Sequence, residues 1–434
     1  MGRSAVMIVQ RQPPPTPCGR GNQMHFICTS IVTTSVLAGT VFADTIEVCP
    51  SCVYTSIQDA IDASGPGDTI NIAAGTYYEA DLDPGGRSIT IRGSLDGAGS
   101  PATSIDAQQS GNVFTFVSGE DAGTVISNLV ITGGGNATID GGGIYCNQSS
   151  PTITGCTING NLSNNRGGGI SCYNNSAPTL SACIISDNTA EQGGGIHCNN
   201  SNPDISDCTI TGNMATQEGG GIHCYNNGNP AVSRCTIADN DGLSGAGIYC
   251  QESAPTISEC SITGGTAIEG GAISCWFESI PIITGCTISD NEAQYAGGIY
   301  SYESNPAITD CRISGNTATN YGGGLYCQTT PAIITSSVFC GNTPDQVDGD
   351  PAPSTDGSLV SDTCWFVGST GACCVSSGCQ PLADDDCTAL GGTWLGEGGS
   401  CDDCAPACQG DVNDDGTVNV LDLLKVIEGW GSCP

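Results

Sequence analysis

The stretch GGGIYC at residues 141–146 returns seven more times along the chain at an almost constant spacing. Six of the seven steps are 26 residues long and one is 25. A fixed period of this length is typical of repeat proteins, in which each repeat is one structural unit that packs on its neighbours. The eight blocks end at Cys146, Cys172, Cys198, Cys224, Cys250, Cys275, Ser301 and Cys327.

Short strands are predicted inside each repeat, because apolar and polar positions alternate. Ile144 and Cys146 fall on one side of the chain and Tyr145 on the other. A period of two residues is that of a β-strand, and none of the repeats holds a stretch of helical periodicity. Strands stacked coil upon coil lie about 4.8 Å apart. The repeats therefore predict an all-β fold, a parallel β-helix over residues 44–342.

Asparagines at the turns that follow an Ile-x-x-Asn pattern are expected to stack inside this solenoid. Their amides would hydrogen-bond from coil to coil and hold the register. Gly264 and Gly265 replace the asparagine in the fifth repeat, where we expect an irregularity. The residues of this predicted ladder are Asn161, Asn188, Asn213, Asn240, Asn291 and Asn316.

The repeats resemble two groups of right-handed parallel β-helix proteins, the pectate-lyase-like superfamily and the repeats of polymorphic outer-membrane proteins. The Gly-Gly-x-Ile signature of the latter recurs in all eight repeats, with one residue changed in three of them (Ala246, Ala296 and Leu325), and their Phe-x-x-Asn signature occurs literally at residues 339–342. The resemblance covers about residues 44–342. It implies a right-handed solenoid and, in the pectate-lyase-like group, lyase or hydrolase activity on polysaccharides.

A capped amphipathic helix is predicted ahead of the repeats, at residues 54–61. Ile57, Ala60 and Ile61 share one face of this helix. Since the first coil of a β-helix has unpaired backbone groups at its open end, we expect the helix to cover that end.

Charge and cysteine content indicate an exported protein that does not bind nucleic acid. The chain has 9 Lys plus Arg against 44 Asp plus Glu, a formal net charge of -35, which repels a phosphate backbone. Its 28 cysteines favour an oxidising compartment. Residues 1–43 are predicted to be a leader with its true start at Met24 and a cut site after Ala43, a membrane anchor being the alternative. The mature chain is then secreted or held at a cell surface, with no membrane span.

The pairing of the repeat cysteines is left open by the sequence. A second series follows each proline by five residues, beginning at Cys156. The cysteines are either stacked buried thiols or disulfides, within a coil as Cys146 to Cys156 or diagonally as Cys156 to Cys172. For Cys49 and Cys52, a structural bridge is expected rather than redox chemistry.

Three further segments are predicted after the repeats. Residues 343–363 are rich in Pro, Asp, Ser and Thr and are expected to be a linker. Residues 364–407 crowd cysteines around a Gly-Gly-Thr-Trp stretch, as in a small disulfide-rich module. Cys401 and Cys404 would be half a zinc site in the alternative interpretation.

Residues 408–434 contain a single EF-hand-like calcium loop followed by a short helix. Oxygen-bearing side chains occupy loop positions 1, 3, 5, 7, 9 and 12, and Gly416 occupies position 6. The segment resembles one half of a dockerin repeat, which implies calcium as the cofactor and a tail-binding protein as a partner. The predicted ligands are Asp411, Asn413, Asp415, Thr417, Asn419 and Asp422.

Aromatic and imidazole rings recur at the outward position of the strand that follows each glycine block. Rings along a rigid solenoid stack on sugar rings, so a polysaccharide or cell-envelope glycan is a candidate partner. His197 and His223 share this position in neighbouring repeats and are expected to be exposed and stacked. The candidate glycan-binding residues are Tyr145, Tyr249, Tyr300, Tyr326 and Trp276, with Tyr173, Tyr225 and Tyr302 beside them.

Catalysis has weaker support in the sequence. Glu252, Glu278 and Glu303 follow the same strand in successive repeats and are the candidate catalytic acids, about 5 Å apart from coil to coil. A lyase also needs a basic side chain nearby, and the arginines of the repeats are scattered. The sequence therefore favours a non-catalytic β-helix protein of adhesin or cell-envelope type with a calcium-dependent tail. The alternative is a polysaccharide lyase or glycoside hydrolase with a dockerin-like appendage.

Overall fold

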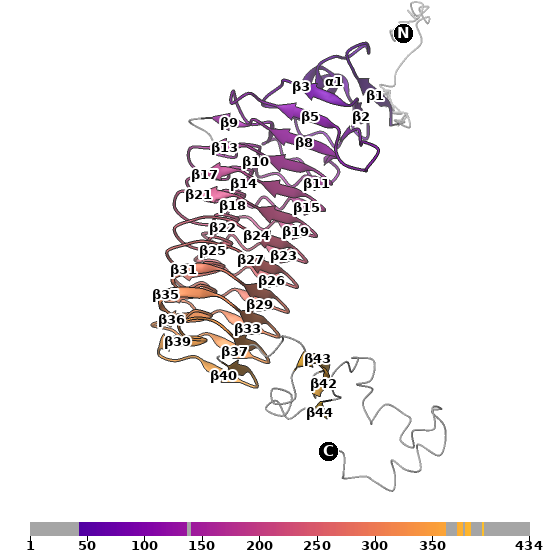
Figure 1. Ribbon diagram of the computed structural model, residues 1–434. Helices are drawn as coiled ribbons and strands as arrows, with labels where there is room; N and C mark the ends of the chain where they lie inside the picture. The colour runs from indigo at the N-terminus through magenta and orange to yellow at the C-terminus, as the bar shows by residue number, and fades with distance from the viewer. Residues whose placement is uncertain (1–42, 137–139, 362–370, 376–377, 383–392, 395–434) are drawn as a thin grey trace, which may run out of the picture. The chain divides into compact units, whose positions relative to one another are not determined.

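The computed structural model describes residues 43–136, 140–361, 371–375, 378–382 and 393–394. Residues 44–136 and 140–361 form a parallel β-helix, with coils stacked one upon another from β1 and α1 to β40 (Figure 1). Three long sheets run along the stack of coils. Over most of the stack, each coil contributes one strand to each sheet.

Sheet 3 contains the strands that follow the glycine blocks. Its ten strands are all parallel. They are β6 (Phe114–Phe116), β10 (Ile144–Asn147), β14 (Ile170–Tyr173), β18 (Ile196–Asn199), β22 (Ile222–Tyr225), β25 (Ile248–Gln251), β28 (Ile273–Trp276), β32 (Ile299–Tyr302), β36 (Leu325–Gln328) and β39 (Val347–Asp350).

Sheets 1 and 2 follow in each coil. Sheet 1 consists of β1 (Thr45–Val48), β2 (Thr69–Ile72), β4 (Thr90–Gly93), β7 (Val125–Ser127), β11 (Thr152–Thr154), β15 (Thr179–Ser181), β19 (Asp204–Ser206), β23 (Ala231–Ser233), β26 (Thr256–Ser258), β29 (Ile282–Thr284), β33 (Ala307–Thr309), β37 (Ile333–Thr335) and β40 (Ser354–Asp356). Sheet 2 consists of β3 (Gly75–Tyr77), β5 (Thr103–Asp106), β8 (Leu129–Thr132), β12 (Thr157–Asn159), β16 (Ile184–Ser186), β20 (Thr209–Thr211), β24 (Thr236–Ala238), β27 (Ser261–Thr263), β30 (Thr287–Ser289), β34 (Arg312–Ser314), β38 (Val338–Cys340) and β41 (Leu359–Ser361).

Short strands complete the described elements. A four-stranded and a two-stranded sheet lie between sheets 2 and 3 in the chain, and three antiparallel strands belong to the tail. They are β9 (Gly135–Asn136), β13 (Leu162–Ser163), β17 (Thr189–Ala190), β21 (Met214–Ala215), β31 (Glu292–Tyr295), β35 (Thr317–Tyr321), β42 (Gly371–Val375), β43 (Gly378–Leu382) and β44 (Thr393–Trp394).

The core is filled by the inward members of the alternating strands. Ile144 and Cys146 are fully buried, and Cys172 and Cys198 are register partners on β14 and β18, as the period predicts. Both cysteine series in residues 146–327 are buried free thiols, so the stacked-thiol alternative is the one observed. Burial of apolar side chains contributes about 25 cal/mol per Å² removed from water.

Glycine is required in each block because the coils approach one another closely there. A Cβ atom on Gly168 would lie 2.5 Å from the carbonyl oxygen of Gly194 and 2.6 Å from that of Thr189. At Gly168 a side chain would have to displace one of these carbonyl groups. Ala246 stands at the same position of the GAGIYC block and is fully buried, so the largest side chain found there is one methyl group. The repeated triple glycine thus lets each chain segment pass under the next.

The predicted asparagine ladder is confirmed. Asn188 Nδ2 donates to Asn213 Oδ1 at 3.0 Å and to the Ile158 carbonyl at 2.9 Å, while Asn188 Oδ1 accepts from Asn161. The ladder is interrupted at Gly265, which has no side-chain amide. At this position only a backbone N–H group donates to the Asn291 Oδ1, at 2.9 Å. All of these amides are buried, so each one satisfies backbone groups that water cannot reach.

The predicted helix is present as α1 (Ile57–Ala63), with Ile57, Ala60 and Ile61 buried. Its N-terminus is held by Ser56, whose hydroxyl accepts from Asp59, and by Glu79, which accepts from the backbone N–H of Ile57 at 2.7 Å. Its role as a cap of the solenoid stays a prediction.

The predicted end of the solenoid at residue 342 is wrong. Residues 343–363, expected to be a linker, contain β39, β40 and β41, which pair with the preceding coil. The 26-residue repeat cannot be recognised here because this coil lacks the glycine block. The strands are nevertheless formed, since they pair through their backbones with the preceding coil. The Cys49–Cys52 bridge is confirmed, with 5.0 Å between the two Cα atoms. The leader and residues 395–434 lie outside the described residues.

Replacing Asn188 by alanine should destabilise the protein by about 3 kcal/mol, because several buried hydrogen-bonding groups lose their partner at once. The free energy of unfolding in denaturant measures this. Asn164→Ala is the matched control, since Asn164 is an exposed asparagine of the preceding coil. Equal stability of the two variants would contradict a stabilising ladder.

Candidate functional site

The outward face of sheet 3 holds two groups of rings. The first, called the upstream stack, spans β10 to β25, and the second, called the ring band, spans β28 to β36 and the segments beside them. The upstream stack consists of Tyr145, Tyr173, His197, His223, Tyr225 and Tyr249. The ring band consists of Trp276, Phe277, Tyr295, Tyr300, Tyr302, Tyr321 and Tyr326.

The upstream stack is continuous but mostly covered. The rings of His197 and His223 lie 5.0 Å apart and almost parallel, and His223 and Tyr249 repeat that spacing. His197 is 0% and His223 2% exposed, so the expectation that they are exposed is wrong. The turn before each strand passes over this face, with Gly193 and Gly219 lying against the two histidines.

Burial dominates the chemistry of the two histidines. Loss of solvation lowers the pKa of His223 to about 3 and that of His197 well below its ordinary value. Arg166 lowers both further, and it also donates to the Tyr173 hydroxyl at 3.2 Å. Among the described residues, both ring nitrogens of His197 and Nδ1 of His223 have no hydrogen-bond partner. The two imidazole rings are therefore neutral and buried inside the fold, and they are not open to a ligand.

The ring band, in contrast, reaches the surface. Trp276 lies 4.9 Å from Tyr302 and 5.5 Å from Phe277, and Phe277 meets Tyr302 edge-on at 84°. Phe277 is 39% and Tyr321 51% exposed. Tyr300, which is 5% exposed, joins the Trp276 end of the band to Tyr326. The band thus offers ring surfaces over three successive coils of a rigid scaffold.

Phe277 occupies an unusual backbone position. It lies in the turn after β28 with a φ of 43°, in register with Asn226, Glu252 and Glu303, which all have positive φ values. Asparagine tolerates this left-handed region, whereas a bulky residue there is an outlier. Such outliers gather at functional sites. The backbone of the turn therefore places an aromatic side chain at the surface at some cost in local strain.

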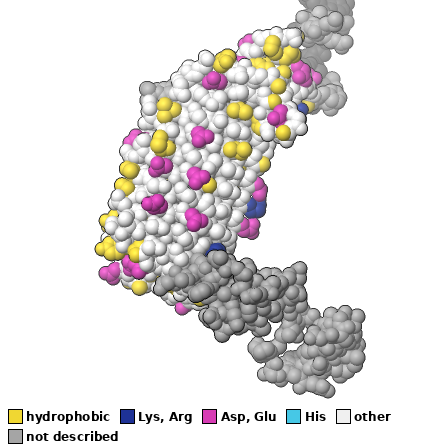
Figure 2. Space-filling view, in the orientation of Figure 1, with side chains coloured by type: hydrophobic (Ala, Val, Ile, Leu, Met, Phe, Trp, Pro, Cys, Tyr) yellow, Lys and Arg dark blue, Asp and Glu magenta, His cyan; other side chains and the backbone are white. Residues whose placement is uncertain are grey.

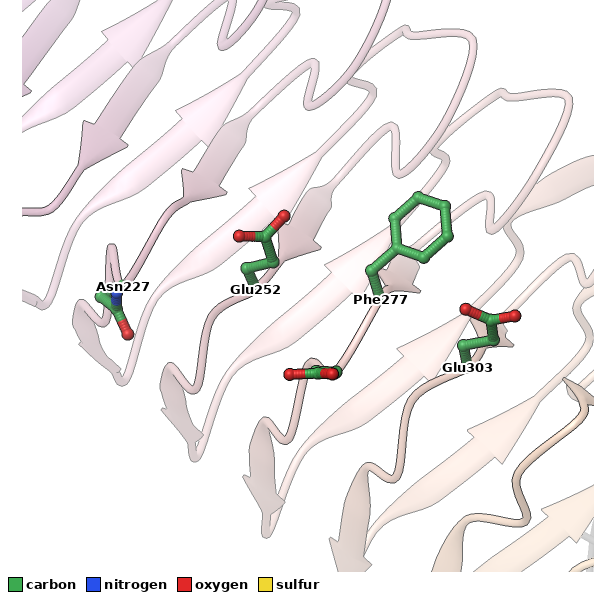
Figure 3. A pocket seen from close by; sticks show the side chains of 5 residues that line it. Asn227, Glu252, Phe277 and Glu303 are labelled. Atoms are coloured by element: carbon green, nitrogen blue, oxygen red, sulfur yellow. The ribbon is translucent and has the colours of Figure 1, made fainter.

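An open groove of about 610 Å³ lies at this turn. It is lined by Asn227, Glu252, Phe277, Glu278 and Glu303, with Glu252 and Glu303 on either side of Phe277 (Figure 3). These two glutamates share one column and are two coils apart, about 9 to 10 Å. Glu278 lies one residue further along the turn, where its N–H donates to the Glu303 carbonyl at 2.8 Å. The predicted even spacing of the three acids is therefore wrong, although all three line one groove.

Acidic side chains surround the ring band. Glu303 raises the pKa of Tyr302, and Asp348 adds to the effect of burial in raising that of Tyr326. Burial and Glu269 together raise the pKa of Tyr300. Figure 2 shows acidic side chains along one face of the coils, with few basic ones among them.

A family model decides the classification of the chain. The model of the right-handed beta helix region matches residues 105–242 and 195–381. The chain belongs to the right-handed β-helix family. No curated protein sequence is significantly similar to this right-handed β-helix.

Several solved structures are similar to this chain at low identity. A pectin methylesterase from Aspergillus niger is 14% identical, with a TM-score of 0.29, over 74% of this chain and 85% of that one. The A-module of a mannuronan C-5 epimerase from Azotobacter vinelandii is 17% identical, with a TM-score of 0.35, over 70% and 91%. A mannuronic acid specific family 6 polysaccharide lyase from human gut microbiota is 10% identical, with a TM-score of 0.25, over 74% and 83%. At these values the likeness carries no argument about activity.

The right-handed β-helix brings together some of the predicted glycan-binding residues and buries others. Trp276 and Tyr326 lie in the ring band and are partly exposed. Tyr145 is partly exposed at the start of the upstream stack, while Tyr249 is only 5% exposed, as is Tyr300. Burial therefore removes Tyr249 and Tyr300 as contact surfaces for a ligand.

Sequence reasoning missed three rings of the band, Phe277, Tyr295 and Tyr321. Phe277 lies beyond the strand that follows the glycine block. The two tyrosines lie in β31 and β35, which come before the glycine blocks. Their recurrence 26 residues apart, at 295 and 321, was the available signal.

Metal and membrane features are limited to what the described residues show. Within them no cluster of three or more His, Cys, Asp or Glu side chains suits a metal ion. The same residues include no helix long and apolar enough to cross a membrane. The predicted calcium ligands at 411–422 lie outside the described residues.

Acid should destabilise the folded protein through His223. Its pKa is about 3 in the folded chain and about 6.5 when unfolded. Between these values only the unfolded state binds the proton, so stability present above about pH 6.5 is lost as the pH falls, by about 1.4 kcal/mol per pH unit. Relative to the parent, His223→Phe should therefore gain about 2 to 3 kcal/mol between pH 6.5 and 4.5, measured as the free energy of unfolding.

Tyr249→Phe is the control for this measurement, because Tyr249 belongs to the same stack and does not titrate in that range. Its difference from the parent should stay constant with pH. A constant difference for His223→Phe as well would contradict the burial of a neutral imidazole.

Proposed function

We propose that this protein is a non-catalytic, secreted or cell-surface glycan-binding protein, with the ring band and its groove as the binding site. The observation that carries the proposal is the cluster of Trp276, Phe277 and Tyr302, which brings three rings within 4.9 to 5.6 Å of one another beside an open groove. Apolar ring faces pack against the C–H faces of sugars, and carboxylates accept hydrogen bonds from sugar hydroxyls.

Rigidity supports binding at this site. The strands that carry the rings are paired on both sides, β28 with β25 and β32, and β32 with β36. A ligand therefore meets ring positions that are already ordered, and little conformational entropy is lost on binding. Successive coils repeat at the strand spacing, so a linear polymer lying along the coils finds rings in successive coils.

A polysaccharide lyase or glycoside hydrolase is the second candidate, favoured by the three carboxylates of the groove. Hydrolase pairs lie about 5 to 10 Å apart, a range whose upper end Glu252 and Glu303 approach. A lyase needs a basic side chain to abstract a proton. Among the described residues that line the groove there is no Lys, Arg or His. Binding without cleavage is therefore preferred.

Replacing either exposed ring should weaken glycan binding. We expect Trp276→Ala and Phe277→Ala each to lower the affinity for the bound oligosaccharide about tenfold, since each removes one stacking surface. Calorimetry with a panel of hexasaccharides measures this. Tyr78→Ala is the control, because Tyr78 is a 64% exposed ring in the loop after β3, remote in sequence from the band.

The same panel distinguishes binding from catalysis. Polysaccharides incubated with the protein are assayed for reducing ends and for unsaturated product. Turnover that disappears in Glu278→Ala would show that the enzyme alternative is right. Loss of binding in Tyr78→Ala to the same extent as in Trp276→Ala would show that the band is not the site.

We also propose that the tail binds calcium and attaches the protein to a partner. The support is the sequence alone, in which six oxygen-bearing side chains and Gly416 match every required position of the loop. The dockerin-like character of this half repeat, its protein partner and the export of the chain by the leader belong to the same proposal.

Calcium titration of the full-length chain should show uptake that depends on the loop. Asp411→Ala and Asp422→Ala each remove a charged ligand and should abolish that uptake, measured by calorimetry. Asp403→Asn removes an acid of the neighbouring module and should leave it unchanged. Identical titrations for all the variants would refute the loop.

A further inference from the structure

Among the described residues, the charged side chains beside the ring band are acidic. The three glutamates of the groove flank its Phe277 end, and at the other end Asp348 is the register partner of Tyr326. Glu269 acts on Tyr300 in the middle. The described arginines are at positions 87, 92, 166, 234 and 312, and none of these lines the groove.

The upstream stack differs in this respect, although it has the same ring spacing. Arg166 donates to Tyr173 and its charge acts on both histidines. The two ring groups are therefore distinguished by charge as well as by exposure. Carboxylates also lie beside the upstream stack, Asp140 at Tyr173 and Glu218 at Tyr249, but there the rings are mostly covered and Arg166 is close by. Only the ring band has exposed ring faces and carboxylates together at an open groove.

Rings and carboxylates attract the same kind of ligand. The face of an aromatic ring carries negative potential and binds an ammonium group within about 6 Å of its centroid. A carboxylate adds a favourable charge interaction, which is stronger where the neighbouring rings keep water away. A negatively charged ligand such as a uronate polymer is repelled by both features.

We propose that the ring band recognises a polysaccharide with free amino groups, a polymer of de-N-acetylated hexosamine; this rests on the glycan-binding function proposed above. The sugar rings pack on Trp276, Phe277 and Tyr302, and the protonated amines face Glu252 and Glu303. The amines are compact and positively charged, and their hydrogens satisfy the carboxylate oxygens.

The spacing of the site favours a polymer over a single sugar. Glu252 and Glu303 are about 9 to 10 Å apart along the stack of coils, and Phe277 lies between them. A chain of linked hexosamines presents amines at regular intervals separated by apolar ring faces. This order of charge, apolar face and charge matches the column of Glu252, Phe277 and Glu303.

Calorimetry of the full-length protein with five hexamers tests this inference. The probes are β-1,4-linked glucosamine, its N-acetylated form, cellohexaose, hexagalacturonate and hexalysine. We expect the glucosamine hexamer to bind about tenfold more tightly than the two neutral hexamers, the effect of a cation–π contact together with an ion pair. Hexagalacturonate should not bind.

Charge variants separate the groove from the general acidity of the chain. Glu252→Gln together with Glu303→Gln should abolish the preference, so that the glucosamine hexamer binds no more tightly to this variant than the neutral hexamers do. The matched control is Glu259→Gln together with Asp310→Asn, two exposed acids that share a column in the turn between sheets 1 and 2. This control pair should keep the preference.

The outcomes distinguish this inference from the proposed function. Equal binding of the glucosamine and neutral hexamers would overturn the amine preference and leave glycan binding in place. Failure of every hexasaccharide to bind would overturn both. Hexalysine binding as tightly as the glucosamine hexamer, or loss of the preference in the control pair, would show attraction to any polycation and would overturn the assignment to an amino sugar.

Discussion

The whole structure depends on backbone hydrogen bonding between coils in strict register. Each strand of a coil pairs with the corresponding strands of the coils before and after it, so that Ile170 lies between Ile144 and Ile196. Such pairing leaves no freedom to slip by one residue, because a slip would turn every inward side chain to the outside. The asparagine ladder reinforces this constraint from within the turns, since its amides bond from coil to coil.

Register turns a sequence position into a line on the molecule. Residues that share a place in the repeat form a column with one member in each coil, separated by the strand spacing. The thiols, the asparagines and the outward rings are all columns of this kind. A binding surface for a linear polymer therefore needs only the same few side chains at corresponding positions of neighbouring coils.

The two ring groups draw on two neighbouring columns of sheet 3. His197, His223 and Tyr249 share one column with Tyr300 and Tyr326. Trp276 and Tyr302 belong to the column of Tyr173 and Tyr225. In the upstream stack, the turns that follow β17 and β21 press glycines against His197 and His223, and the rings stabilise the fold as buried stacked pairs. In the ring band, Trp276 is the last residue of β28 and Phe277 lies in the turn that follows, where it is 39% exposed. The carboxylates of that turn then complete an open site.

The repeat period by itself determined the strands, their parallel pairing, the inward cysteines and asparagines and the outward rings, because a period of two residues within a period of 26 assigns every side chain to a column and a face. It also placed Trp276 and the three glutamates in one region. Only the tertiary structure decided that the repeat cysteines are free thiols. It alone decided which outward side chains are exposed, since that depends on the turns that fold back over sheet 3. It also decided that Phe277, and not Glu278, lies between Glu252 and Glu303. The repeat from Cys250 to Cys275 is one residue shorter than the others, which shifts Glu278 one position along the left-handed turn. The physical reason is that alternation reports the two faces of a strand, whereas exposure and convergence depend on segments that are not strands.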